Sequence, residues 1–196
     1  MPRQKFENEY TYKRMLESGS EDEFDRLFDK AAEEARDGFG AEHPIYIAGR
    51  QVRAEQLLIE KSPIDAQIVI GKFQKGTREH ARLAIDAARK AFETWSITDY
   101  RKRASIIRKA ADLFSRDKYS LAAILSYENA KSRYESVGEV DEAIDFMRYY
   151  ADELEANKGF IRKTALKAST SKVAAGFQGA PGSQERVTIS LRPYGV

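Results

Sequence analysis

The stretch from residue 132 to residue 157 constrains the fold of this chain more than any other. Ser132 and Glu135 have the spacing of a capping box, in which each side chain accepts a backbone N–H of the other residue. Apolar residues then recur at alternating intervals of three and four: Val137, Val140, Ile144, Met147, Ala151 and Leu154. This spacing predicts one long helix with a coiled-coil-like apolar stripe. We expect the stripe to pack on other helices of the same chain; the alternative is a helix from a second subunit.

Helical spacing also marks the first forty residues. Ser20 and Glu23 have capping-box spacing, and Gly38 and Gly40 provide a stop signal. Between them, apolar residues recur at helical intervals: Phe24, Leu27, Phe28, Ala31 and Ala35. These features predict a helix that ends before Gly38, with a shorter helix over residues 10–16.

Three further helices are predicted between residues 77 and 131. Thr77 begins the first, which carries small and aromatic residues on one face: Ala81, Ala84, Ala88, Phe92 and Trp95. The alanines of this face would allow close packing against a neighbouring helix. Thr98 is the predicted cap of the second helix, and the third carries Leu121, Ala122 and Leu125.

Residues 44–73 have the character of β-structure. Short runs at 45–47, 57–59 and 67–73 are rich in β-branched residues, and turn signals separate them. This pattern predicts three or four short antiparallel strands within residues 45–73. The fold class is therefore α+β, with a mainly helical layer over residues 1–159 that includes these small strands.

The pattern changes again after Gly159. Residues 160–184 are rich in Lys, Ala, Ser, Thr and Gly, which is typical of a linker. Residues 185–192 alternate, with Val187, Ile189 and Leu191 on one side and Thr188 and Ser190 on the other. This alternation predicts a half-buried strand, with its partner expected around residues 170–177. Residues 160–196 therefore form a second predicted unit.

The histidine and cysteine counts exclude several kinds of site. The 196 residues contain no cysteine, so they provide no disulfide, cysteine zinc finger or thiolate nucleophile. Two histidines, His43 and His80, cannot build a three-histidine zinc site. Neither has a second metal-type ligand at suitable spacing, so both are predicted to be ordinary surface residues. No phosphate-binding glycine loop, GxSxG or HExxH motif is present.

Charge and hydropathy limit the classes of binding partner and the cellular compartment that we expect for this chain. Thirty-three basic and 31 acidic residues give a formal net charge of +2, which argues against nucleic-acid binding driven by bulk charge. A charged fraction of 33% without cysteine is compatible with a thermophilic source. No apolar run is long enough to span a membrane, and the first residues do not have the pattern of a signal peptide. We therefore expect a cytoplasmic protein.

An acidic cluster lies on the long predicted helix. It consists of Glu139, Asp141, Glu142 and Asp145, with Gly138 one turn before Glu142. The favoured interpretation is a solvated outer face opposite the apolar stripe. The alternative is that Gly138 leaves space through which a ligand could approach Glu142.

Several residue strings resemble the amino-terminal part of an aldehyde dehydrogenase. They include Tyr46-Ile47-Ala48-Gly49-Arg50, Ala91-Phe92-Glu93-Thr94-Trp95, Lys109-Ala110-Ala111-Asp112-Leu113 and Arg192-Pro193-Tyr194-Gly195-Val196. The run from Glu142 to Ala151 and the long segment before the first strand are similar to the 1-pyrroline-5-carboxylate dehydrogenase branch, also called glutamate-semialdehyde dehydrogenase. One departure is Ala130, where the family usually has glycine.

The resemblance implies a function for the full-length family and a limited role for this chain. Family members of this branch oxidise glutamate semialdehyde to glutamate with NAD, in proline degradation, through a cysteine thiolate. The 196 residues contain no such cysteine and no family NAD site, so we expect a truncated chain that binds no cofactor and is inactive alone. In the branch, a glutamate that matches Glu142 lies near the amino group of the substrate. Glu142 is thus the one expected substrate-binding residue.

The resemblance also implies partners. Residues 160–196 would include part of the oligomerisation hairpin of the family, so we expect a homo-oligomer or association with full-length family subunits. The alternative function is a non-catalytic oligomerisation or interaction module. In that case the helical stripe and the strand over residues 185–192 would bind other chains.

Overall fold

Helices dominate the computed structural model, which describes residues 6, 8 and 11–161. The order is α1 (Thr11–Ser18), α2 (Glu21–Asp37), β1 (Glu42–His43), β2 (Ile45–Ile47), β3 (Arg50–Val52), β4 (Leu57–Lys61), β5 (Val69–Gln74), α3 (Arg78–Trp95), α4 (Tyr100–Arg116), α5 (Lys118–Asn129), α6 (Arg133–Ala156) and the short 3-10 helix η2 (Lys158–Phe160). The predicted α+β class with a mainly helical layer is confirmed. No described helix is long and apolar enough to cross a membrane.

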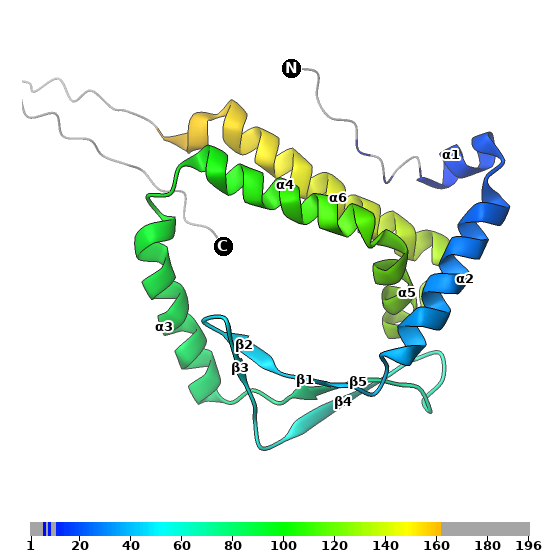
Figure 1. Cartoon of the computed structure of the whole chain (residues 1–196), viewed down its shortest axis with the longest axis horizontal. Helices are drawn as coiled ribbons and strands as arrows, with labels where there is room; N and C mark the ends of the chain where they lie inside the picture. Colours follow the sequence, from blue (N-terminus) through cyan, green and yellow to red (C-terminus); the bar gives the residue numbers. More distant parts are fainter. Residues whose placement is uncertain (1–5, 7, 9–10, 162–196) are drawn as a thin grey trace, which may run out of the picture.

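The long helix α6 is the centre of the helical core. Its predicted capping box is present, since Ser132 Oγ accepts from the Glu135 N–H at 3.3 Å and the Glu135 carboxylate accepts from the Ser132 N–H at 3.0 Å. Helix α4 runs beside α6, and α5 packs against both α6 and α2 (Figure 1). The stripe residues Val137, Val140, Ile144 and Ala151 are buried. The stripe therefore packs on helices of its own chain, as expected.

Helix α2 adds an aromatic contact to this core. The Phe24 ring stacks on the Tyr134 ring, with centroids 5.0 Å apart and planes inclined by 7°. The capping box predicted at Ser20 is wrong: Ser20 makes no side-chain bond to the first turn of α2. Its hydroxyl instead lies 2.7 Å from Ser18 Oγ, because α1 ends immediately before it and offers a nearer partner.

The strands form two small sheets. β2 and β3 are an antiparallel hairpin, and β4 pairs antiparallel with β5. β1 lies on the other edge of β5 and runs parallel to it, with Glu42 opposite Lys72 and His43 opposite Phe73. The four strands over residues 45–74 are therefore antiparallel in their pairs, as expected, whereas β1 lies outside the predicted range and was not expected. This strand is only two residues long and comes directly after the turn that follows α2, so it has no alternating pattern of its own.

Helix α3 differs from the other long helices because none of its residues is buried. The expected close packing of its alanine face is therefore not found within the described residues. Thr77 caps this helix as predicted, whereas the next helix, α4, is capped by Asp99 and not by Thr98. The Asp99 carboxylate accepts from the Arg101 N–H at 2.8 Å, while the Thr98 hydroxyl is bonded backwards to the Thr94 carbonyl.

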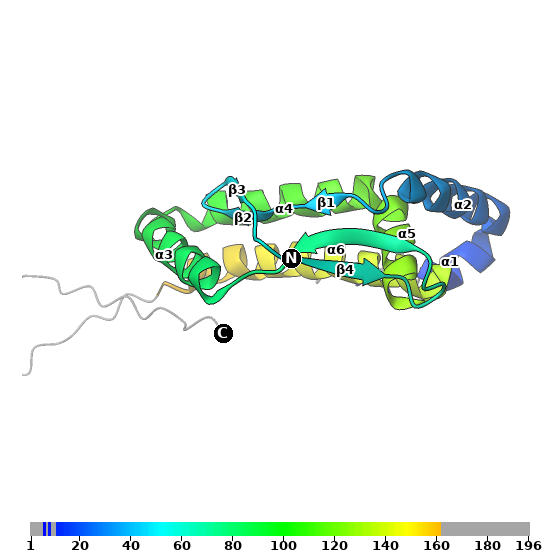
Figure 2. The same cartoon turned by 90° about the horizontal axis from the view of Figure 1, so that it is seen from below.

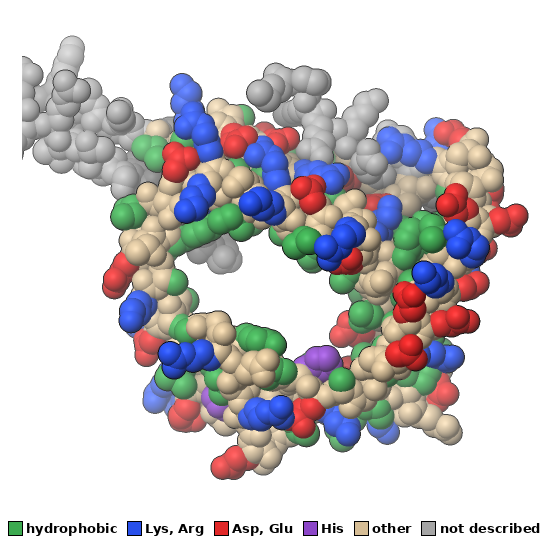
Figure 3. Space-filling model, viewed as in Figure 1, with side chains coloured by type: hydrophobic (Ala, Val, Ile, Leu, Met, Phe, Trp, Pro, Cys, Tyr) green, Lys and Arg blue, Asp and Glu red, His purple; other side chains and the backbone are tan. Residues whose placement is uncertain are grey.

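Together these elements surround an opening. In Figure 1, α3, the strands, α2 with α5, and the α4–α6 pair form the four sides of a ring. Seen from below, in Figure 2, the ring is flat. The space-filling view shows that the opening passes through the molecule and that hydrophobic side chains lie along its inner margin (Figure 3). Of the predicted linker over residues 160–184, Phe160 ends η2 and Ile161 follows it, and residues 162–184 lie outside the described residues. So do the predicted strand over residues 185–192 and its partner around residues 170–177.

Candidate functional site

The acidic cluster of α6 is not the solvated face that the sequence favoured. Asp145 is only 2% exposed and accepts from the backbone N–H of Asn8 at 3.1 Å. Asp141 accepts from Thr11 Oγ1 at 2.7 Å and forms an ion pair with Lys118, with Nζ 3.1 Å from its Oδ1. The interpretation fails for Asp141 and Asp145 because Asn8 and the α1 residue Thr11 bond to them on this side of α6.

The two glutamates of the cluster have different surroundings. Glu139 forms an ion pair with Lys131 on the exposed side of the helix. Glu142 is half-buried, and no residue of the described part of the chain forms a hydrogen bond or ion pair with it. Of the four acidic side chains, Glu142 is therefore the one whose carboxylate is available to a ligand within this part of the structure.

Space is present one turn before Glu142. A Cβ atom built on Gly138 would have no heavy atom within 4 Å, apart from its own helix backbone and chain neighbours. Residues four apart lie on the same helix face, so this space and the Glu142 side chain share one side of α6. The site thus combines an unpaired carboxylate with room beside it, although no catalytic group accompanies them.

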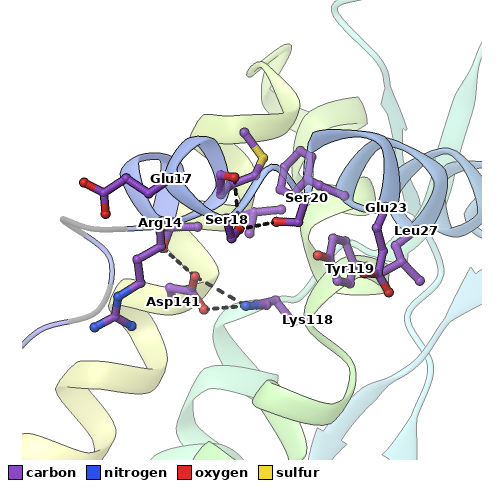
Figure 4. Close-up of a pocket in the computed structure, with 13 residues that line it drawn as sticks. Arg14, Glu17, Ser18, Ser20, Glu23, Leu27, Lys118, Tyr119 and Asp141 are labelled. Carbon is purple, nitrogen blue, oxygen red and sulfur yellow. Dashed lines mark hydrogen bonds and ion pairs between the residues drawn. The ribbon is translucent and has the colours of Figure 1, made fainter.

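A cavity of about 700 Å³ lies on the other side of Asp141, between α1, α2, α5 and α6. Figure 4 shows the ion pair of Asp141 and Lys118 at one wall, with Arg14 and the hydroxyls of Ser18 and Ser20 nearby. Burial raises the pKa of the Tyr119 hydroxyl above its ordinary value, so the phenol stays protonated.

The residues of this cavity attach α1 to the rest of the molecule. Lys118 forms an ion pair with Asp141. The described lining residues include no histidine or cysteine that could form a nucleophile–base pair. The sequence analysis missed Thr11 and Lys118, because their partner Asp141 lies 130 and 23 residues away. No local pattern connects residues so far apart.

The two histidines have structural roles. The His43 ring stacks on Phe73 at a centroid distance of 5.0 Å. The His80 Nδ1 accepts from the Thr77 N–H at 3.1 Å and completes the capping box of α3. Within residues 6, 8 and 11–161, no group of three or more His, Cys, Asp or Glu side chains could hold a metal ion.

Comparison with known proteins identifies the family. Residues 52–180 match the sequence model of the aldehyde dehydrogenase family. The chain belongs to the aldehyde dehydrogenase family. It is 38% identical over 127 residues to 1-pyrroline-5-carboxylate dehydrogenase 2 of Bacillus subtilis, a match that covers 65% of this chain and 25% of that protein. It is 36% identical over 130 residues to the 1-pyrroline-5-carboxylate dehydrogenase of Bacillus licheniformis, covering 66% and 25% of the two chains.

A solved structure agrees with this relationship. The 1-pyrroline-5-carboxylate dehydrogenase from Thermus, crystallised with bound NAD, superposes with a TM-score of 0.66 and 34% sequence identity. The superposition covers 68% of this aldehyde dehydrogenase chain and 26% of the Thermus chain. The chain thus spans about a quarter of the length of the relatives it matches. The resemblance to the 1-pyrroline-5-carboxylate dehydrogenase branch, over part of its length, is confirmed.

Proposed function

We propose that this chain is the amino-terminal layer of a 1-pyrroline-5-carboxylate dehydrogenase, an enzyme that oxidises glutamate semialdehyde to glutamate with NAD. The observation that supports this most strongly is the 38% identity to the Bacillus subtilis enzyme. The Thermus relative, whose structure contains NAD, has the same fold over the matched part. In this proposal the other three quarters of such an enzyme supply the NAD site and the thiolate.

The 196 residues alone are proposed to be inactive. They contain no cysteine, and a thiolate is the nucleophile that the proposed reaction requires. Incubation of the purified chain with glutamate semialdehyde and NAD is therefore expected to yield no NADH. A second chromatography step removes contaminating enzymes. NADH formation that stays with the chain after this step would overturn this part of the proposal.

Within the proposed enzyme, Glu142 binds the ammonium group of the substrate. Its carboxylate is half-buried and has no partner in the described part of the chain, whereas Asp141 and Asp145 accept hydrogen bonds from other residues. Gly138 leaves open space on the same face. A carboxylate that meets an ammonium group in a half-buried site forms a strong, charge-assisted hydrogen bond.

A full-length chimaera tests this role. Residues 52–180 of this chain, the part that matches the family model, would replace the corresponding segment of the Bacillus subtilis enzyme. In that chimaera, Glu142→Gln is expected to raise KM for glutamate semialdehyde by roughly 10-fold or more, since a hydrogen bond to a charged group contributes about 1.5–3 kcal/mol. The matched control is Glu139→Gln, which removes a carboxylate that is already paired with Lys131.

The substrate 5-oxopentanoate, which lacks the amino group, makes the test specific. If Glu142 binds the ammonium group, Glu142→Gln will leave KM for this aldehyde unchanged. Equal losses with both aldehydes would mean that Glu142 acts on the fold or on the aldehyde itself, and the proposed role would be rejected.

We also propose that exposed apolar residues of α3 and of the turn after it contact the remainder of a full-length subunit or a second copy of the chain. Ile85, Phe92 and Ile97 are 52%, 50% and 79% exposed. Light scattering of the isolated chain is expected to detect association, because exposed apolar surface favours it. A monomer at high concentration would count against self-association.

A further inference from the structure

A histidine completes the capping box at the start of α3. The Nδ1 atom of His80 accepts from the Thr77 N–H at 3.1 Å, and Thr77 Oγ1 accepts from the His80 N–H at 3.4 Å. The box at the start of α6 has the same form but uses the carboxylate of Glu135 in place of an imidazole. The two boxes therefore differ in their response to pH, because only the imidazole changes its charge near neutral pH.

This capping box joins an anchored strand to an unpacked helix. At the end of β5, the Gln74 side chain accepts from the Ala54 N–H at 2.7 Å. The next residue, Lys75, donates its N–H to the Gln56 carbonyl at 2.9 Å. Beyond this point α3 has no buried residue, and within the described structure it contacts only β2 appreciably. The bonds of the box therefore determine how the chain enters α3.

We propose that protonation of His80 opens this capping box, so that the first turn of α3 is an acid-sensitive joint between the sheet and the helix. An imidazole nitrogen accepts a hydrogen bond only while it carries no proton. In the imidazolium both ring nitrogens are donors, so the Thr77 N–H loses its acceptor. Thr77 Oγ1 lies 3.4 Å from Nδ1 and can accept the new N–H, but that bond does not replace the one that the Thr77 amide loses. A positive charge in the first turn also opposes the helix dipole.

The charged groups around the box do not share this response. The charged residues that line the cavity beside it are two basic and two acidic ones, Arg53, Lys75, Glu55 and Glu79. Arg78 is the remaining charged residue in the first turn, and the three residues of β2 are uncharged. Side chains of these types stay ionised between about pH 8 and about pH 5.5, whereas histidine gains a proton there. Among the described residues beside the box, His80 is therefore the one whose charge changes.

NMR of the 196-residue chain at about pH 8 and about pH 5.5 tests the joint. At the higher pH, the nitrogen chemical shifts of the His80 ring should show Nδ1 without a proton. The second measurement is the hydrogen-exchange rate of the Thr77 amide, divided by the rate of an unstructured peptide at the same pH. The resulting protection should fall several-fold at the lower pH. The Ser132 amide, which donates to the Glu135 carboxylate, is the internal control and should keep its protection.

Two variants assign the change to His80. His80→Gln places a neutral acceptor at the same position of the box, so the Thr77 amide should be equally protected at both pH values. His80→Ala should leave this amide unprotected at both. Three results would overturn the proposal: unchanged protection in the parent chain, no protection of the parent at the higher pH, or an equal fall in His80→Gln. The last result would assign the response to another group, such as His43.

Discussion

Helices α3 and α4 are nearly equal in length, with 18 and 17 residues, and both have an apolar face. In α4, Ala104 and Ala111 are completely buried against its neighbours. In α3, Leu83 and Trp95 are 55% and 41% exposed, and no residue is buried. Amphipathic spacing therefore predicts that a helix forms and which face is apolar, but it does not predict that a partner covers the face.

The difference comes from what lies opposite each helix. Small side chains on α5 and α6, including Ala122, Ala123 and Ser136, are buried and let the helices of the core approach closely. Helix α3 contacts only β2 appreciably within the described structure and borders the opening. Its alanine face has the composition for close packing, but no neighbouring helix is present there.

The largest effect should come from truncating one isoleucine in each region. Ile144→Ala in α6, where the side chain is 4% exposed, is expected to lower the free energy of unfolding by about 2–4 kcal/mol. Ile85→Ala in α3, at 52% exposure, should change it by less than about 0.5 kcal/mol. Urea unfolding measures both. Similar losses in the two variants would mean that α3 is covered in solution, and the comparison of the two regions would fail.

A buried hydroxyl pair sharpens the contrast inside the core. Ser126 Oγ and Ser136 Oγ are 2.7 Å apart, and both residues are buried. Ser136→Ala should destabilise the chain by about 1–2 kcal/mol because it leaves the Ser126 hydroxyl without this partner. The double variant with Ser126→Ala should be less destabilised than the sum of the single variants. Ser105→Ala, at an exposed position, is the control; a fully additive double-mutant cycle would contradict the prediction.

The two capping boxes allow a matched comparison of a packed and an unpacked helix. Ser132→Ala should lower the free energy of global unfolding by about 1 kcal/mol, since α6 is part of the core. Thr77→Ala removes an equivalent bond from α3 and should mainly speed amide hydrogen exchange in its first turn. Urea unfolding of both variants measures the global loss of stability, and amide hydrogen exchange measures the local opening of each helix. An equal global loss would show that α3 unfolds together with the core.

The smallest effect concerns pH. Arg108 on α4 bonds to Asp152 at 2.6 Å and Glu155 at 2.7 Å on α6, and the bond from Arg108 lowers the pKa of Glu155 below its ordinary 4.5. A lowered folded pKa stabilises the chain above the ordinary value, and this contribution is lost as pH falls through the folded pKa. The urea midpoint of unfolding should therefore fall less between about pH 6 and about pH 3 in Arg108→Met than in the parent chain. Arg89→Met, in a 3.7 Å pair on α3, should leave the pH profile unchanged.

Local patterns predicted the parts of the fold that depend on nearby residues. The capping box of Ser132 is of this kind, because its partner Glu135 lies within one turn. The spacing also predicts which residues of α6 are buried, from Val137 to Ala151, but not that the stripe shares a core with α2. The parallel strand β1 was not predictable in this way, since Glu42 and His43 have no alternating pattern and their partner β5 lies 30 residues away.

The acidic cluster shows the same limit at the candidate site. Asp141 and Asp145 were expected in solvent, and the residues that bond to them, Thr11 and Asn8, are 130 and 137 positions away. Glu142 was singled out by family resemblance and by the gap at Gly138, and its role stays a prediction. Physical patterning alone cannot distinguish Glu142 from its neighbours, because the distinction depends on which acids Asn8 and Thr11 bond to.

Ala130 ends α5 in a left-handed backbone conformation, with φ 56° and ψ 28°. A side chain in this conformation costs roughly 1 kcal/mol, and glycine, which the family resemblance led us to expect here, avoids that cost. Replacing Ala130 by glycine in the turn between α5 and α6 should therefore raise the thermal stability of the chain. Ancestral reconstruction or directed evolution for thermal tolerance would be expected to reach glycine at this position early.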